Sequence, residues 1–169
     1  KILPRKNVLI RPASANVDQA LVVFAITQPD PNFNLLDRFL IMMLAQDIPV
    51  TICFNKTDLE NGAKQQEYRS IYEQAGYPVM FVSTYEKSGV EAVRDYLRGK
   101  TTILAGPSGV GKSSLTNLLQ PEAAMETGSI SEKIKRGKHT TRHAELFCVE
   151  EDTYLMDTPG FSSMYLEEI

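Results

Sequence analysis

The sequence TTILAGPSGVGKSSL, residues 101–115, contains the pattern that decides the fold of this chain of 169 residues. Its apolar beginning predicts a buried strand, and the residues from Lys112 onward predict a helix. Between the two, the spacing G-x-x-x-x-G-K-[ST] is matched by Gly106, Gly111, Lys112 and Ser113. A Gly-rich turn could also join a strand to a helix. The strand before the pattern and the helix after it favour a loop that binds a nucleotide's phosphates.

Phosphate oxygens need several donors at close range, which explains the residue types of this segment. Glycine lets backbone N–H groups turn inward without side-chain clashes, and the next helix directs its positive end at the same charge. Lys112, a predicted catalytic residue, would reach the β- and γ-phosphates, and the Ser113 hydroxyl would bind Mg²⁺. We call residues 106–113 the phosphate loop. The predicted phosphate contacts are Gly106, Pro107, Ser108, Gly109, Val110, Gly111, Lys112, Ser113 and Ser114.

A second motif, FNKTDL at residues 54–59, ends an apolar run that predicts a strand over residues 49–55. An N-K-x-D pattern is weak alone, since a surface turn would look the same, but ligands of α/β proteins bind at this end of the strands. The Asp58 carboxylate can accept hydrogen bonds from N1–H and the N2 amine of guanine, whereas adenine would leave it unpaired. The motif therefore predicts selection of guanine.

Neighbouring residues complete the predicted base contacts. Asn55 would hydrogen-bond the base and ribose side, and the Lys56 stem would cover the ring. The second base loop, VST at residues 82–84, ends another predicted strand; there Ser83 would brace the loop and the Thr84 N–H would meet guanine O6. The predicted guanine-binding residues are Asn55, Lys56, Thr57, Asp58, Ser83 and Thr84.

The order of the motifs is reversed relative to a small GTPase, because the guanine loop, residues 55–58, precedes the phosphate loop. The predicted strands match that fold's last three strands followed by its first three, at residues 20–26, 49–55, 78–83, 101–106, 144–150 and 153–158. Joining the old termini takes only RGKT, residues 98–101, and domain termini are often neighbours. We predict an α/β fold: a circularly permuted Ras-like P-loop GTPase domain, with a mostly parallel sheet and helices on both faces.

Three helices are predicted before the phosphate loop. The first covers residues 35–46 with Asn34 as N-cap, the second residues 63–76, and the third residues 88–99. Ser88 and Glu91 form a capping box at the start of the third. Helical spacing places four residues of the second on its buried face: Tyr68, Ile71, Tyr72 and Ala75.

Composition is that of an ordinary soluble globular protein, with 43% hydrophobic and 23% charged residues. The net charge of −3 argues against a generic polyanion binder, so a nucleic-acid contact must come from a local patch. Cys53 and Cys148 lie in apolar runs, and we expect both to be reduced core residues of a cytoplasmic protein. No apolar run approaches the roughly 20 residues that cross a bilayer, so no membrane partner is expected.

Together the motifs resemble the circularly permuted GTPases, and among them the ribosome small-subunit-dependent GTPase A (RsgA/YjeQ) family. The resemblance covers nearly the whole chain and includes GKHTTRH (137–143) and DTPGFSS (157–163). It implies Mg²⁺-dependent hydrolysis of GTP to GDP, stimulated by the ribosome, in late maturation of the 30S ribosomal subunit with its 16S rRNA. Alternatives are a nucleotide-gated RNA-binding module, a permuted GTPase acting on the large subunit, and an ATP-using P-loop enzyme.

The resemblance also implies neighbouring domains. Residues 1–16 would be the end of an upstream OB-fold-like domain and a linker, and residues 17–169 the GTPase domain. The family's C-terminal zinc domain has no counterpart in these residues, so zinc is expected only in that missing domain. We expect a monomer.

The last motif suggests residues that respond to the γ-phosphate. In DTPG, Asp157 would hold Mg²⁺ through water and Gly160 N–H would sense the γ-phosphate, although D-x-P-G also suits a plain turn. Thr140 or Thr141 would give a second hydroxyl to Mg²⁺, with Thr141 favoured by likeness to other bacterial GTPases. Two β-branched residues could equally begin a strand.

Turnover should be slow without a partner, because Phe161 stands where a Ras-type enzyme has its water-positioning glutamine. The resemblance implies catalysis by a histidine of the GKHTTRH motif, which makes His139 the catalytic candidate. Its imidazole can accept a proton from water near neutral pH, but a lone histidine in a basic loop can also contact RNA.

Residues 121–142 lack an apolar period and are expected to form a mobile loop. Their basic residues could carry an RNA contact or form an ordinary solvated face. The predicted RNA contacts are Lys133, Lys135, Arg136, Lys138 and Arg142.

Overall fold

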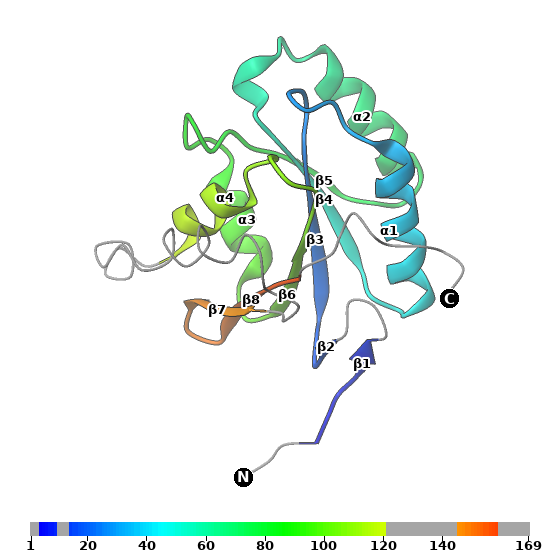
Figure 1. Cartoon of the computed structure of the whole chain (residues 1–169), viewed down its shortest axis with the longest axis vertical. Coiled ribbons are helices and arrows are strands. Elements are labelled where there is room, and N and C mark those ends of the chain that lie inside the picture. The colour runs from blue at the N-terminus through cyan, green and yellow to red at the C-terminus, as the bar shows by residue number, and fades with distance from the viewer. Residues whose placement is uncertain (1–3, 10–13, 121–144, 159–169) are drawn as a thin grey trace.

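A six-stranded sheet forms the centre of the molecule (Figure 1). The computed structural model describes residues 4–9, 14–120 and 145–158. The strand order is β5-β4-β3-β6-β8-β7, and only the β7–β8 pair is antiparallel. The bounds are β3 Gln19–Ala25, β4 Val50–Asn55, β5 Val79–Phe81, β6 Thr101–Ala105, β7 Glu145–Glu150 and β8 Thr153–Asp157. The predicted mostly parallel α/β sheet is confirmed.

The continuous apolar run of β3 is buried along its whole length, because helices cover both faces of the sheet. Helices α1 (Phe33–Ala45) and α2 (Ala63–Gln74) lie on one face, and α3 (Val90–Leu97) and α4 (Lys112–Leu119) on the other (Figure 1). Alternate strand residues feed two separate cores. Phe24 and Phe54 pack with α1 and α2, whereas Val23 and Cys53 pack with α3 and α4.

The permuted connection joins α3 to β6. It brings β6 beside β3 in parallel register. At the turn, Gly99 N donates to Thr153 Oγ1 at 2.9 Å, and Tyr154 N donates to Lys100 O at 3.0 Å. These bonds seat the junction between α3 and β6 against the start of β8.

A short hairpin, β1 (Val8–Leu9) and β2 (Ser14–Ala15), precedes the sheet. Leu9 is 3% exposed and belongs to the core beneath α1, and Val17 N donates to Asn7 Oδ1 at 2.9 Å. The described part of residues 1–16 thus packs against the sheet domain. Its assignment to an upstream domain and linker stays a proposal.

Two predicted helix starts are wrong. The N-cap of α1 is Asn32 rather than Asn34, because Asn32 has the extended backbone of a cap and its side chain accepts from Leu35 N at 3.2 Å. The α3 helix starts after Gly89, and no side chain caps it. Ser88 is instead held by two backbone bonds of 3.0 Å to Ser83, so no capping box forms.

Three predicted core residues lie on the surface. On α2 only Tyr68 and Tyr72 are buried, while Ile71 is 51% exposed and Ala75 is exposed too. Ile71 and Ala75 sit on the flank of the helix that turns away from the sheet. Cys53 is buried as expected, which raises its thiol pKa to about 12, but Cys148 is exposed. Cys148 alternates on edge strand β7 with Phe147 and Val149, which face the core.

Candidate nucleotide-binding site

The predicted motifs meet at the carboxyl edge of the sheet, where α/β proteins bind their ligands. The guanine loop follows β4, the second base loop follows β5, and the phosphate loop follows β6. Asp157 ends β8, the next strand of the sheet. Segments about fifty residues apart in sequence therefore form one candidate site.

Asn55 ties three of these loops together. Its side chain is 1% exposed, and Nδ2 donates to Val110 O of the phosphate loop at 2.9 Å. The same atom reaches Thr84 Oγ1 at 3.3 Å, and Thr84 N donates to Asn55 Oδ1 at 3.1 Å. Asn55 thus fixes the spacing between the base loops and the phosphate loop. Its predicted contact with the ligand, and that of the Thr84 N–H with O6, stay predictions, because both groups have protein partners here.

Asp58 is held by the second base loop. Ser83 Oγ donates to Asp58 Oδ1 at 2.6 Å and accepts from Glu86 N at 3.0 Å, and Ser83 is fully buried. One carboxylate oxygen is therefore fixed in place, with the side chain half-buried. This is the bracing role predicted for Ser83, and it preorganises the carboxylate for two neighbouring donors of a purine.

Thr57 and Lys56 shape the guanine loop from either side. Thr57 N and Oγ1 both donate to Val82 O, at 3.3 and 3.1 Å, which clamps the loop to the end of β5. Lys56 has a φ of 64°, and its ammonium group donates to the carbonyl of Gln28 in the loop after β3. The contact with Gln28 could not be predicted from sequence, because a backbone carbonyl can belong to any residue type.

The phosphate loop depends on two glycines that no other residue could replace without distortion. A Cβ at Gly106 would lie 2.2 Å from Val23 O, and one at Gly111 would lie 2.2 Å from Asn55 Nδ2. Gly111 also has a φ of 94° and directly precedes α4, whose first turn has no side-chain cap. The N–H groups at the start of α4 are therefore not taken by a capping side chain, as anion binding requires.

Lys112 and Asp157 face each other across this edge, with Nζ and Oδ1 4.0 Å apart. Burial lowers the pKa of Lys112, and the charge of Asp157 opposes that shift. Burial likewise raises the pKa of Asp157, and Lys112 and the Thr158 backbone N–H oppose it. Each charge is only partly compensated, so an anion beside Lys112 and a cation beside Asp157 would both be favoured. Carboxylate and hydroxyl oxygens are the donors that Mg²⁺ prefers, and Ser113 is exposed in the first turn of α4.

Several predicted site residues lie outside the described residues, together with the loop predicted over 121–142. They are Lys133, Lys135, Arg136, Lys138, His139, Thr140, Thr141, Arg142, Gly160 and Phe161. Within the described ranges, no cluster of three or more His, Cys, Asp or Glu residues could hold a metal ion. Nor does any helix in those ranges have both the length and the apolar character to span a membrane.

We expect Gly111→Ala to destabilise the fold by about 2–4 kcal/mol, because it adds a clash with Asn55 to the cost of its positive φ. Gly62→Ala is a matched control: its φ is 97°, and no atom lies within 4 Å of the added Cβ. It should cost only about 1 kcal/mol. Urea unfolding of both variants measures the difference, and equal losses would show that the contact between Asn55 and the phosphate loop is unimportant.

The chain matches a family described as RsgA GTPase over residues 2–167. A relative from Agathobacter rectalis, named small ribosomal subunit biogenesis GTPase RsgA, is 65% identical over 97% of this chain and 54% of its own length. A relative of the same name from Alkaliphilus metalliredigens is 53% identical over 98% of this chain and 57% of its own. The chain thus spans about half the length of the curated relatives it matches.

Two solved structures share the fold. The crystal structure of YjeQ from Thermotoga maritima has a TM-score of 0.77 at 32% identity, covering 100% of this chain and 57% of its own. YloQ, described as a circularly permuted GTPase, has a TM-score of 0.72 at 35% identity, covering 100% of this chain and 53% of its own.

Proposed function

The chain belongs to the RsgA GTPase family, and on that premise we propose that it binds and hydrolyses GTP in maturation of the small ribosomal subunit. The observation that carries this proposal is the Asn55 side chain, which joins residues 55–58 and the second base loop to the phosphate loop at one edge of the sheet. That spacing suits a single guanine nucleotide with its base against Asp58 and its phosphates at Lys112.

We propose the following division of labour for hydrolysis. The α4 N–H groups and Lys112 bind the phosphates, and Gly160 N–H senses the γ-phosphate. Ser113 and Asp157 hold Mg²⁺ with Thr141 or Thr140, and the ion neutralises charge on the phosphate oxygens when bound. His139 orients or deprotonates the attacking water. Support for Lys112, Ser113 and Asp157 comes from their shared edge; the other roles rest on the motifs.

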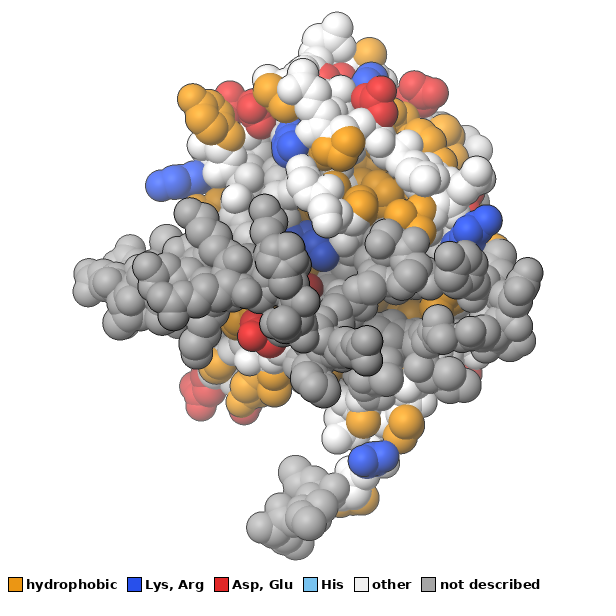
Figure 2. Space-filling view, viewed as in Figure 1, with side chains coloured by type: hydrophobic (Ala, Val, Ile, Leu, Met, Phe, Trp, Pro, Cys, Tyr) orange, Lys and Arg blue, Asp and Glu red, His pale blue; other side chains and the backbone are white. Residues whose placement is uncertain are grey.

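The partner we propose is the 30S subunit, contacted through 16S rRNA by the basic residues of the segment between α4 and β7. Lys and Arg side chains of described residues are scattered across the face seen in Figure 2 rather than gathered into one patch. The net positive run of that segment is our candidate for a phosphate-backbone contact. Apart from Ile41 and Leu44 on α1, the large exposed apolar side chains of the described residues lie on separate segments, which supports a monomer. We propose that it works in the cytoplasm.

Steady-state GTP hydrolysis by the intact protein, with and without purified 30S subunits, tests the proposal. We expect stimulation on the order of a thousandfold with 30S subunits, and none with 50S subunits.

Changing the five predicted RNA contacts to alanine should remove the stimulation and leave basal turnover intact. His139→Ala should keep GTP binding but lose stimulated turnover. Equal rates with and without 30S subunits would contradict the proposal.

A further inference from the structure

The helix that follows the phosphate loop is short, and its own side chains stabilise its ends little. It has eight residues, with no side-chain cap at its start and no basic residue in its last turn. Helices of this length are marginal in water, and the last four carbonyls of any helix have no partner within it. Neighbouring elements must therefore hold α4 in place.

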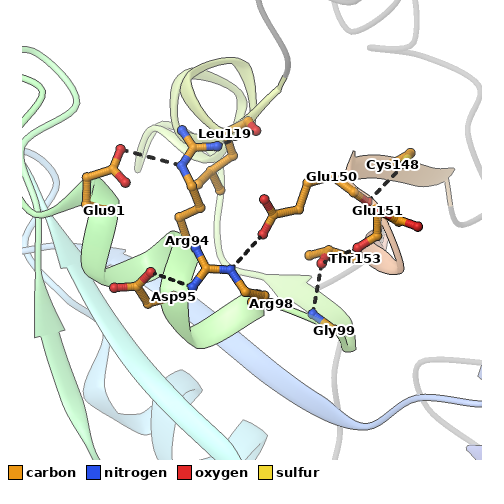
Figure 3. Close-up of polar contacts among 10 residues, drawn as sticks. All are labelled: Glu91, Arg94, Asp95, Arg98, Gly99, Leu119, Cys148, Glu150, Glu151 and Thr153. Carbon is orange, nitrogen blue, oxygen red and sulfur yellow. Dashed lines mark hydrogen bonds and ion pairs between the residues drawn. The ribbon is translucent and has the colours of Figure 1, made fainter.

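Arg94 of α3 supplies that support at the far end. Its Nη1 donates to Leu119 O at 3.2 Å, and its Nη2 donates to Leu118 O at 3.1 Å. Figure 3 shows the side chain reaching from α3 to the end of α4, with Glu91 paired to it at 3.5 Å. The Arg94 side chain is 24% exposed, so its charge acts in a partly dehydrated position. A planar guanidinium can serve two adjacent carbonyls at once, whereas an ammonium cannot match that geometry.

The two ends of α4 are linked through the helix dipole and through its rigidity. A cation at the carboxyl end and an anion at the amino end are both favourable, and each supports the same orientation of the peptide dipoles. Once α4 is held in place, the hydrogen bonds between its turns make a tilt at Leu119 also move the N–H groups beside Lys112. Among the described residues, α4 has no basic side chain in its own last turn, and Arg94 donates to the carbonyls of both Leu118 and Leu119.

We propose that Arg94 is a positioning residue for phosphate binding: it fixes the carboxyl end of α4 and so aims the opposite end, with Lys112 and Ser113, at the polyphosphate. This inference rests on the proposed function, in which that end binds the phosphates of a guanine nucleotide. It extends the site to Arg94, which lies on another helix and would not itself contact the nucleotide.

The test separates phosphate binding from base binding by comparing GDP with guanosine. Binding of each to Arg94→Met is measured in the intact protein by calorimetry and by competition. We expect GDP to bind about tenfold more weakly, while guanosine affinity is unchanged because the base loops lie on other strands. Arg94→Lys keeps the charge but not the planar guanidinium, so its GDP affinity should lie between those of Arg94→Met and the wild type.

Arg98→Met is the matched control. Arg98 lies one turn further along the same surface, is 59% exposed, and pairs with Asp95 and Glu150 rather than with α4 (Figure 3). Its loss should change GDP affinity by less than about twofold. The inference would be overturned if Arg94→Met bound GDP with wild-type affinity, or if its affinities for GDP and guanosine fell equally. If Arg94→Met does not fold, the same comparison is made with Arg94→Lys. A wild-type protein that binds neither ligand would instead refute the proposed function.

Discussion

Replacing Lys112 with alanine should lower the rate of GTP hydrolysis by about a thousandfold. The Lys112 side chain is only 21% exposed, and its ammonium group lies at the sheet edge where α4 begins. Burial already lowers its pKa, so its charge is poorly solvated and gains strongly from a phosphate oxygen. Without it, charge that builds up on the transferred phosphoryl group would lose the positive charge that Lys112 supplies.

Lys64→Ala is the control for this variant. Lys64 is 39% exposed and pairs with Asp30 at 3.7 Å; it lies in the first turn of α2, on the opposite face of the sheet from α4. Single-turnover hydrolysis with a saturating amount of each protein separates the rate of phosphoryl transfer from nucleotide affinity. A Lys112→Ala protein that retains half the wild-type rate of phosphoryl transfer would contradict a role for Lys112 in GTP hydrolysis.

Replacing Asp58 with asparagine should weaken GDP binding at least about a hundredfold and create a preference for xanthosine diphosphate. Ser83 donates to Oδ1 of Asp58, so in the variant the carbonyl oxygen should keep that place and the amide nitrogen should face the base. An amide N–H would oppose the N2 amine of guanine, but it can donate to the oxygen that xanthine carries at that position.

Calorimetric titration with GDP, xanthosine diphosphate and ADP measures this change. Asp30→Asn makes the same chemical change at an exposed carboxylate of the β3–α1 loop and should leave all three affinities as they are. A variant at Asp58 that still prefers GDP would mean that the N-K-x-D segment is a surface turn with no role in base selection.

The architecture was predictable because it follows from motif order and from buried strands. Motifs at the ends of apolar runs identified the strands and their common edge, and the reversed order of the loops indicated the circular permutation. These features depend on short stretches of sequence. Motif order and buried strands can therefore be identified without knowing how the side chains pack.

The errors concern choices that only tertiary structure makes. Asn32 and Asn34 are both good caps in sequence, and the backbone at Asn32 decides between them. Helical spacing correctly predicted that Tyr68 and Tyr72 of α2 are buried, but it could not predict how wide the buried face of this helix is. Cys148 looks like a core residue within ELFCVE, yet an edge strand buries only alternate residues.

The site shows the same division. Sequence spacing predicted that the guanine and phosphate loops share an edge, but it could not show that Asn55 would be hydrogen-bonded to both other loops. Arg94 lies 24 and 25 residues from the carbonyls it contacts. From its charge alone, Arg94 would be an ordinary surface residue of α3. Its role is visible only from the packing of α3 against α4, which brings it to the carbonyls at the end of α4.

A crystal structure of the protein with GDP and Mg²⁺ would test the central claim most directly. We predict one nucleotide that spans the edge of the sheet, with its guanine N1 and N2 against the Asp58 carboxylate and its β-phosphate at the α4 N-terminus beside Lys112. Phosphates in the phosphate loop with the base turned away from residues 55–58 would contradict it.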